Sequence, residues 1–450
     1  FNYIFNFYYI LLYYKMSLYS DSVVKTRYLD PKIYVPSVRC SFDLDNTEAA
    51  YLPNLRLTMI GAKSAAGGTY ASLPGSVGGL IRNIRLMDGK VELSAKSEFG
   101  FWRGFQNQNR SNAQAQAIGT NLHSSAVGRT IDGNTRKISQ NVVQNEYGTT
   151  LADSEAGAGW LDLREVFPIL NSMTHLPTSI FENLRIEVEF NKVASLNNLG
   201  NTADPLFETL RPVLAADVIE NPAVVANLNK TLGTIMWNEI EHDQFVIPAG
   251  AGLGANGVVG AAGEGAVQPL NVKLNGFNNK IVDRVLLVKE MANWATHEAT
   301  GANEQKGFGR WSSQACYKQV VQFRINGGNV VPRNGIVADN ERLAYMVDTW
   351  GDCANYTTSN IYGNTDASAI LGLSGGAAGG ESYWVGQLDY VGCYIGQYIS
   401  DFQFDYQRTG LQNGIGKNAT SDTLIGHMYG EVRKTLQFQA NGQYLISYVQ

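Results

Sequence analysis

Each half of the chain contains a short amphipathic helix that is followed, after a loop, by an alternating strand. In the first half the helix is predicted over residues 161–170 and the strand over 181–190. In the second half the helix is predicted over 339–350 and the strand over 402–408. Further β segments follow each strand. Two large β modules in tandem, with long loops, are more typical of a protein that builds a shell than of an enzyme.

The residue patterns of the first helix and strand carry these predictions. Asp162 and Glu165 have the spacing of a capping box. An apolar stripe on the helix faces a core and comprises Leu163, Val166, Phe167 and Leu170. The strand has one apolar face, made of Leu184, Ile186, Val188 and Phe190. Its other face is charged, so we expect a sheet with one face in solvent.

Turn signals divide the rest of the chain. Asp88-Gly89 and Asn441-Gly442 each predict a two-residue hairpin, in which both turn positions need positive φ. Asn221-Pro222 predicts a helix start, because a cap precedes Pro at the first helical position. Residues 105–145 are rich in Gln, Asn, Ser and Gly and are predicted to form a long exposed loop.

Length and element order together predict the fold class. A chain of 450 residues, 44% hydrophobic and 17% charged, suits two cores of about 200 residues each. Strands dominate and no regular α/β alternation occurs, so we predict an all-β protein with a few short helices and two antiparallel jelly rolls. The predicted divisions are an N-terminal arm at 16–40, a first jelly roll at 41–220, a linker helix at 221–233 and a second jelly roll at 234–450.

Residues 1–15 use only Phe, Asn, Tyr, Ile, Leu and Lys, all encoded by AT-rich codons, and the first Met is Met16. We interpret this stretch as translated upstream DNA. A signal peptide would need a basic leading region and a small-residue cleavage site, and both are missing. A spanning helix would need about 20 apolar residues, and Lys15 ends the run earlier.

Charge and cysteine content exclude some classes of protein. The 35 basic and 40 acidic residues give a net charge of -5, which disfavours a strongly cationic nucleic-acid binder. The four cysteines are spread without a CxxC pair, which favours a reducing compartment and gives no zinc pattern: Cys40, Cys316, Cys353 and Cys393.

Several short motifs imitate catalytic sequences without their context. GLGANG at 252–257 matches a dinucleotide fingerprint, but the segment after it is too rich in glycine to predict a helix. Ser374 lies in a GxSxG match upstream of His427, but glycines follow it where a nucleophile elbow needs a helix. HEATG at His297 has Gly301 in place of the second His, and residues 410–418 miss the P-loop spacing. We therefore predict no catalytic, cofactor-binding or metal site.

An acidic group on a predicted strand leaves two interpretations open. Glu239, Glu241 and Asp243 alternate around His242 and could attract a cation, but a solvated strand face is the stronger interpretation, because one His is not a ligand set. Four N-x-S/T sequons would matter only in a secreted protein and begin at Asn109, Asn229, Asn355 and Asn418.

Four segments together resemble the major capsid proteins of Polinton-like viruses and virophages. They are LREVFPIL with LPTSIFENLRIEVEF, then the run from VQFRINGGNVVP to MVDTWGD, then GEVRKTLQFQANGQYLISYV. The resemblance spans residues 50–450 in the expected order. It implies a double jelly roll with two eight-stranded sandwiches.

The same resemblance implies a structural role without enzymatic activity. Three copies would form a pseudo-hexagonal trimer, or capsomer, and many trimers would tile an icosahedral shell around double-stranded DNA. The expected partners are the protein itself, neighbouring trimers, and penton and minor capsid proteins, with no sequence-specific nucleic acid and no membrane insertion. The expected location is the virion, after assembly inside the host cell. The arm at 16–40 would lie inside the shell, and loops such as 105–145 and 355–383 would form trimer contacts or an outer tower.

Two other classes stay open at this level. A tandem jelly-roll glycan-binding or adhesin protein would use the same fold. A hydrolase using Ser374 would label with an active-site serine reagent.

Overall fold

The computed structural model describes the strands, the helices and the short segments that join some of them. The described residues are 24–36, 38–44, 49–60, 81–108, 128–131, 134–137, 160–181, 183–191, 211–248, 268–291, 318–336, 339–350, 391–409, 424–439 and 442–449.

The second half forms two four-stranded antiparallel sheets. The first sheet has the order β14-β21-β16-β19, with β14 at Thr234–Ile247, β21 at Leu424–Phe438, β16 at Lys280–Met291 and β19 at Val391–Ile399. The second has the order β15-β20-β17-β18, with β15 at Gln268–Lys273, β20 at Phe402–Thr409, β17 at Lys318–Ile325 and β18 at Asn329–Ile336. Counted along the chain, strands 1-8-3-6 face strands 2-7-4-5. This is the strand order of a jelly roll.

The first half repeats this order. Its sheet β1-β13-β5-β10 contains β1 at Val24–Leu29, β13 at Arg211–Ile219, β5 at Arg56–Ile60 and β10 at Trp160–Asp162. Its sheet β3-β12-β6-β7 contains β3 at Arg39–Asp43, β12 at Leu184–Phe190, β6 at Ile81–Asp88 and β7 at Val91–Lys96. The chain is therefore two jelly rolls of one topology, and the predicted fold class is correct.

Short elements extend these sheets and cover their ends. Additional strands are β2 at Ile33–Val35, β4 at Ala50–Tyr51, β11 at Leu176–Pro177, β22 at Tyr444–Tyr448 and the hairpin of β8 at Gly128–Ile131 with β9 at Asn134–Lys137. The helices are α2 at Phe99–Gln108, α4 at Ile169–Ser172, α7 at Pro222–Asn229, α8 at Asp339–Trp350 and the 3-10 turn η3 at Asn275–Phe277. No helix of the described residues is long and apolar enough to cross a membrane.

The predicted N-terminal arm is corrected by β1. Residues 24–29 pair antiparallel with β13 over the whole length of β1, and β2 pairs with β3. Lys25 and Arg27 both form ion pairs with Glu220, the residue that follows β13. From Val24 onward the segment is therefore the first strand of the first jelly roll, because its backbone completes the ladder of β13. Residues 1–23 lie outside the described part of the chain.

The predicted helix at 161–170 is also wrong in form. Residues 160–162 are strand β10, a series of turns follows, and only α4 is helical. The predicted stripe of Leu163, Val166, Phe167 and Leu170 is nevertheless fully buried. Asp162 accepts a bond from the Arg164 amide, while the Glu165 carboxylate pairs with Arg103, so no capping box forms.

The repeated helix of the two halves is a different one. In each jelly roll a helix follows the fifth strand: α2 follows β7, and α8 follows β18. The prediction of α8 at 339–350 is correct to the residue, but its counterpart is α2. Residues 105–108, predicted as loop, belong to α2, and residues 128–137 contain the β8–β9 hairpin; the rest of 105–145 lies outside the described residues.

Both predicted hairpins exist, with turns that differ from the expected type. Asp88 pairs with Val91, so the first turn is Gly89-Lys90, and only Gly89 has positive φ (56°), as in a type II′ turn. In the second, the Gly442 amide donates to the Gln439 carbonyl (3.1 Å) and Gly442 has a φ of 81°. That is the three-residue loop in which the last residue is left-handed. The predicted cap of α7 is correct, since the Asn221 side chain accepts the Ala223 amide at 3.0 Å.

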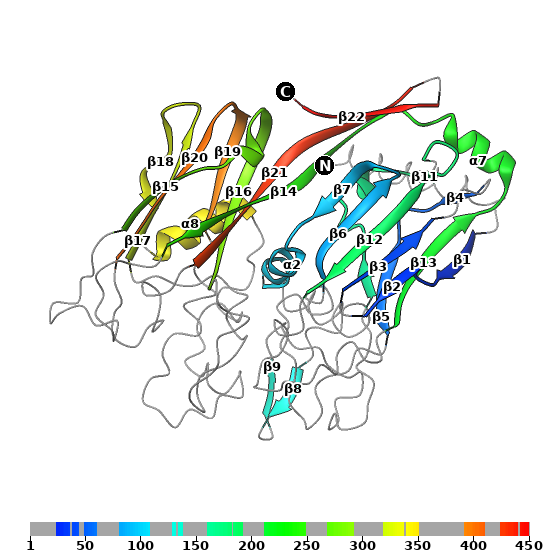
Figure 1. The fold of residues 1–450 in the computed structure, drawn as a ribbon, viewed down its shortest axis with the longest axis horizontal. Helices are drawn as coiled ribbons and strands as arrows, with labels where there is room; N and C mark the ends of the chain where they lie inside the picture. Colours follow the sequence, from blue (N-terminus) through cyan, green and yellow to red (C-terminus); the bar gives the residue numbers. More distant parts are fainter. Residues whose placement is uncertain are drawn as a thin grey trace, which may run out of the picture.

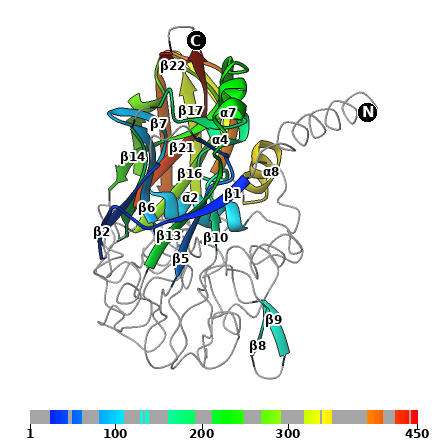
Figure 2. The same ribbon diagram turned by 90° about the vertical axis from the view of Figure 1, so that its right-hand side faces the viewer.

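The sheets stack in a row along the long axis of the molecule (Figure 1). One core lies between the two sheets of the second half and includes Val285, Leu287, Phe323, Phe404 and Tyr406. The larger core fills the first half and continues into the second, where it includes Trp237, Leu286, Val288, Tyr429 and Leu436. Figure 2 views the molecule from the end that carries β1 and β2.

Candidate functional site: the junction between the two jelly rolls

The outer face of one second-half sheet is covered by the first half. On β16, Val285 and Leu287 face the core between the second-half sheets, whereas the alternate residues Leu286 and Val288 belong to the core shared with the first half. Because side chains alternate along a strand, this sheet is buried on both faces. Strand β7 and helices α2 and α4 supply the covering surface.

The two equivalent helices meet at this junction through aromatic rings. Trp102 and Phe105 of α2 each make an edge contact with Trp350 of α8, with centroids 5.4 and 5.7 Å apart. Trp102 also contacts Tyr429 of β21 at 5.5 Å, and the Tyr429 hydroxyl donates to the Glu98 carbonyl at 2.9 Å. Burial of such large rings stabilises an interface strongly. The aromatic cluster therefore fixes the angle between the two jelly rolls.

Trp350 is itself held in place by the second half. Its indole nitrogen donates to the Val285 carbonyl at 3.1 Å, and the Arg284 guanidinium lies 4.1 Å from the ring centroid. Arg284 also forms an ion pair with Glu431 and donates to the Thr349 carbonyl at 2.8 Å. Gly392 allows α8 to approach β19, because a Cβ there would lie 2.7 Å from the Met346 sulfur and from Trp350.

A buried ion pair crosses the junction. Lys96 of β7 pairs with Glu239 of β14, and their side chains are only 2% and 1% exposed. The Glu239 carboxylate also accepts bonds from the Ser94 hydroxyl (2.6 Å) and the Trp237 indole (3.1 Å). Burial lowers the pKa of Lys96, and the neighbouring Glu239 carboxylate opposes that shift. Both charges are thus desolvated, and each depends on a residue from the other half.

A second charged group lies within the second half beside this pair. The Glu241 carboxylate pairs with Lys280 and with Lys434, and it accepts the Tyr448 hydroxyl at 2.5 Å. Burial opposes ionisation of Glu241, but the two lysines lower its pKa overall. Burial likewise disfavours the charge on Lys434, yet the carboxylates of Glu241 and Glu239 raise its pKa overall.

Two histidines stack at the contact with α2. His242 Nε2 lies 2.9 Å from His427 Nδ1, and the His427 ring stacks on Phe101 of α2 with centroids 4.7 Å apart. Burial, followed by the charge of His427, lowers the pKa of His242 well below its ordinary value. His242 is therefore neutral near pH 7, and its Nε2 shares a hydrogen bond with His427 Nδ1.

The C-terminal hairpin reaches back to the first half. Tyr444 of β22 donates its hydroxyl to Asp88 at 2.8 Å, and its ring makes an edge contact with Phe181 at 5.1 Å. Phe438 also contacts Phe181, at 5.9 Å. The hairpin thus adds a second point of attachment above the main junction.

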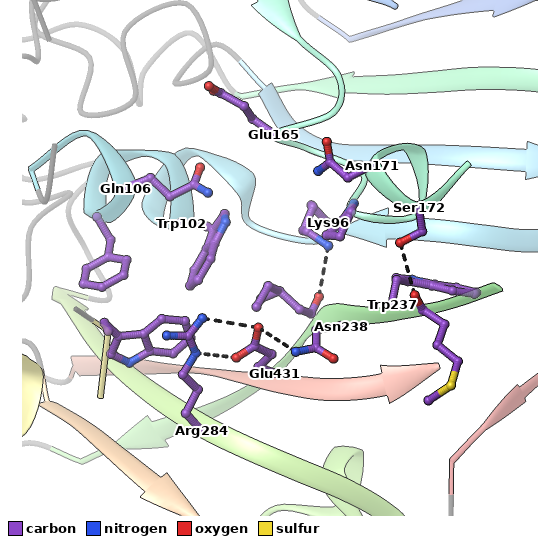
Figure 3. Close-up of a pocket in the computed structure, with 15 residues that line it drawn as sticks. Lys96, Trp102, Gln106, Glu165, Asn171, Ser172, Trp237, Asn238, Arg284 and Glu431 are labelled. Atoms are coloured by element: carbon purple, nitrogen blue, oxygen red, sulfur yellow. Dashed lines mark hydrogen bonds and ion pairs between the residues drawn. The ribbon is translucent and has the colours of Figure 1, made fainter. Parts of the chain in front are cut away.

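An open pocket of about 670 Å³ lies on one side of the junction (Figure 3). Trp102, Gln106 and Glu165 line it from the first half, and Asn238, Arg284 and Glu431 line it from the second. The Arg284–Glu431 pair closes one wall, and the Ser172 hydroxyl donates to the Met236 carbonyl at 3.1 Å on another. The Ser172–Met236 bond crosses the junction, whereas Arg284 and Glu431 pair within the second half, so these polar groups already have structural partners.

Of the acidic group predicted on β14, Glu239 lies at this junction, whereas Glu241 and Asp243 have their partners within the second half. Glu239 pairs with Lys96, Glu241 pairs with two lysines, and Asp243 accepts the Gly276 amide at 3.0 Å. The prediction of a solvated face is wrong for Glu239 and Glu241, because cations from other strands cover both. Among the described residues, no group of three or more His, Cys, Asp or Glu is placed to hold a metal ion.

Most of the other motifs fall outside the described residues. These are the 252–257 glycine segment, Ser374, His297, residues 410–418, Cys316, Cys353 and the sequons at Asn109, Asn355 and Asn418. His427 is described and stacks at the junction. Asn229 bonds His175 at 2.8 Å and donates to the Ser179 hydroxyl, while Cys40 and Cys393 are buried free thiols whose pKa burial raises to about 12.

Sequence reasoning missed Lys96, Trp102 and Trp350 as junction residues. Lys96 is the last residue of β7, and a charged residue at the end of a strand is usually solvated. The available signal was one Lys on β7 and one Glu on β14, because both strands are otherwise rich in buried residues. Only the fold brings these two residues together as a pair.

Comparison with solved structures gives the fold. PBCV-1 VP54, in a structure fitted into a cryo-EM reconstruction of the virophage Sputnik, aligns with a TM-score of 0.52 and 9% identity over 95% of this chain and 98% of its own. The mavirus major capsid protein aligns with a TM-score of 0.50 and 9% identity over 94% of this chain and 90% of its own. No family model and no curated protein sequence matches the chain. With the strand orders above, these alignments establish the double jelly-roll fold over nearly the whole chain.

Proposed function

We propose that this protein is a major capsid protein, a structural component that builds the shell of an icosahedral double-stranded DNA virus. The observation that carries the proposal is the junction: two jelly rolls of identical strand order share one core, a buried ion pair and an aromatic cluster. A binding protein with two independent lectin-like modules does not need such rigid coupling. A shell subunit does, because the angle between its modules sets the geometry of the lattice.

The end-to-end likeness to two viral capsid structures supports the same proposal. Three chains with two similar modules each supply six units, so a trimer can occupy a hexagonal lattice position. We extend the proposal to self-association into such trimers, to penton and minor capsid proteins as partners at other lattice positions, and to a location in the virion after assembly in the host cell. The comparisons give the glycan-binding and hydrolase alternatives no support.

The mass of the purified protein in solution tests the proposal. Sedimentation and light scattering should give three times the chain mass of 49.2 kDa. Large obligate interfaces couple folding to assembly, so dilution should release little folded monomer. Nuclease treatment should leave the mass unchanged, because a chain of net charge -5 does not need nucleic acid to associate. A monodisperse monomer at micromolar concentration would contradict the proposal.

A further inference from the structure

Two histidines from neighbouring strands form a stack against helix α2. His242 of β14 and His427 of β21 have ring centroids 5.2 Å apart, and His242 Nε2 lies 2.9 Å from His427 Nδ1. Phe101 of α2 stacks on the His427 ring at 4.7 Å, and the Tyr429 ring lies 4.9 Å from His242. Because α2 lies between the two halves (Figure 1), this stack connects the second-half sheet to the first half.

Helix α2 also connects the stack to the aromatic cluster of the junction. Phe101 is followed by Trp102, which contacts Tyr429 at 5.5 Å and Trp350 at 5.4 Å. His427 is only 1% exposed. Since closely packed rings leave little free space, a shift of His427 displaces Phe101 and with it the helix that carries Trp102. The position of the histidine pair therefore affects the whole contact between the halves.

The hydrogen bond between the two rings depends on their protonation. In a neutral imidazole one ring nitrogen carries hydrogen and the other accepts a bond. One of the facing nitrogens can donate to the other as long as the acceptor carries no proton. When both rings are imidazolium, all four nitrogens carry hydrogen, so the bond cannot form and two like charges lie close together. The stack is thus compatible with one imidazolium and incompatible with two.

The other charged groups around the histidines already have partners, among the side chains that the structure describes. The elements that pack around the stack are α2, β7, β14, β16 and β21, and their ion pairs are Glu98 with Arg82, Arg103 with Glu165, Lys96 with Glu239, Glu241 with Lys280 and Lys434, Asp283 with Arg433, and Glu431 with Arg284. Asp243 accepts the Gly276 amide, and Lys289 lies 3.5 Å from the Tyr406 hydroxyl. Imidazole is the side-chain group that ordinarily changes charge between pH 8 and 5. Mild acid therefore acts on this contact through the histidines.

We infer that the His242–His427 pair is an acid-sensitive release between the two jelly rolls. At neutral pH the hydrogen-bonded stack supports α2 against β14 and β21. On acidification a second imidazolium breaks the bond between the rings, α2 loses this support, and the junction loosens while the core between the second-half sheets stays intact. For a shell subunit, the angle between the modules is then fixed at neutral pH and relaxed in an acidic compartment. That biological role rests on the proposed function, whereas the release itself uses only groups of one chain.

The direction and size of the pH effect follow from burial. Burial, followed by the charge of His427, lowers the pKa of His242 well below its ordinary value of 6.5. In an open junction His242 contacts water and binds a proton below that ordinary value. Lowering the pH from 7.5 to 5.5 therefore favours the open junction by about tenfold for this one group.

Hydrogen–deuterium exchange of the intact protein at pH 7.5 and 5.5 tests the inference. Protection factors, which correct for the intrinsic effect of pH on exchange, should fall about tenfold in acid for the amides of α2. Those of β17 and β20, on the far sheet of the second half, should stay the same. His242→Gln places an uncharged amide near the position of Nε2, so it should remove the response of α2. His175→Gln is the matched control, because His175 is also buried but bonds Asn229 within the first half, and its α2 should respond as in wild type.

The possible results separate the release from other effects of acid. Equal protection of α2 at both pH values in wild type, or an equal fall in α2, β17 and β20, would overturn the inference. A folded His242→Gln variant whose α2 still responds to acid would also overturn it. His427→Asn, whose amide lies near the position of Nδ1, replaces His242→Gln if that variant does not fold, and the wild-type comparison of α2 with β17 and β20 decides alone if neither folds. The mass of the protein at pH 7.5 is measured in parallel, because a monomer there contradicts the proposed function and not the release.

Discussion

Removal of one partner of the Lys96–Glu239 pair should loosen the two jelly rolls. Lys96→Met leaves a carboxylate that is only 1% exposed without its cation. Breaking a buried ion pair in this way costs about 3 to 5 kcal/mol. Three donors still bond Glu239, from Ser94, Trp237 and the Ile240 amide. We therefore expect a loss of unfolding free energy at the lower end of this range, about 3 kcal/mol. The variant should therefore unfold at a clearly lower urea concentration.

A double-mutant cycle isolates the pair from its surroundings. Glu239→Gln keeps an acceptor for Ser94 and Trp237 but removes the charge, so the double variant Lys96→Met/Glu239→Gln should recover about 2 kcal/mol of the single-variant loss. Lys32→Met is the control, because its pair with Asp43 is exposed on the lysine side (68%) and should matter by less than about 1 kcal/mol. Urea unfolding followed by tryptophan fluorescence measures the wild type, the two single variants of the pair, the double variant and the Lys32→Met control. A loss below about 1 kcal/mol for Lys96→Met, or additive losses in the double variant, would refute the reasoning.

Three further changes have expected outcomes. As pH falls below about 6.5, the unfolded chain binds a proton that buried His242 does not, so His242 should lower the free energy of unfolding by up to about 1.4 kcal/mol per pH unit. Burial lowers the pKa of His175 in the same direction, so His242→Gln should reduce, without abolishing, the slope measured by urea unfolding between pH 6.5 and 5. Glu241, whose pKa is lowered, contributes to acid sensitivity only below about 4.5, outside that window. Gly442→Val should cost about 1 to 3 kcal/mol, because φ there is 81°; an unchanged thermal midpoint would contradict the turn assignment. Gly392→Ala should push α8 from β19 and cost about 1 to 3 kcal/mol, with a loss of tryptophan burial as its optical signature.

Much of the fold follows from local pattern. The period of two in β12 and the period of 3.6 in α8 predicted those elements, because each has a single apolar side that must be buried. The cap at Asn221 predicted α7 for an equally local reason, a side-chain acceptor for a free amide. These features need only neighbouring residues to be recognised.

The errors arise where distant partners decide the structure. Residues 24–29 have no strong strand pattern and become β1 only because β13, almost 200 residues later, offers a free edge. The stripe at 163–170 is buried as predicted, yet the pairing of Trp160–Asp162 with β5 replaces the first helical turn by a strand. The junction was not predicted from the sequence for the same reason, since Lys96 and Glu239 are brought together only by the packing of the two halves.

Electron microscopy of the purified protein tests the central claim most directly. The account predicts uniform particles of hexagonal outline with threefold symmetry, in which six jelly-roll densities lie around the ring. Single two-lobed particles, or rings with any other number of chains, would contradict the assignment of this protein as a shell-building subunit.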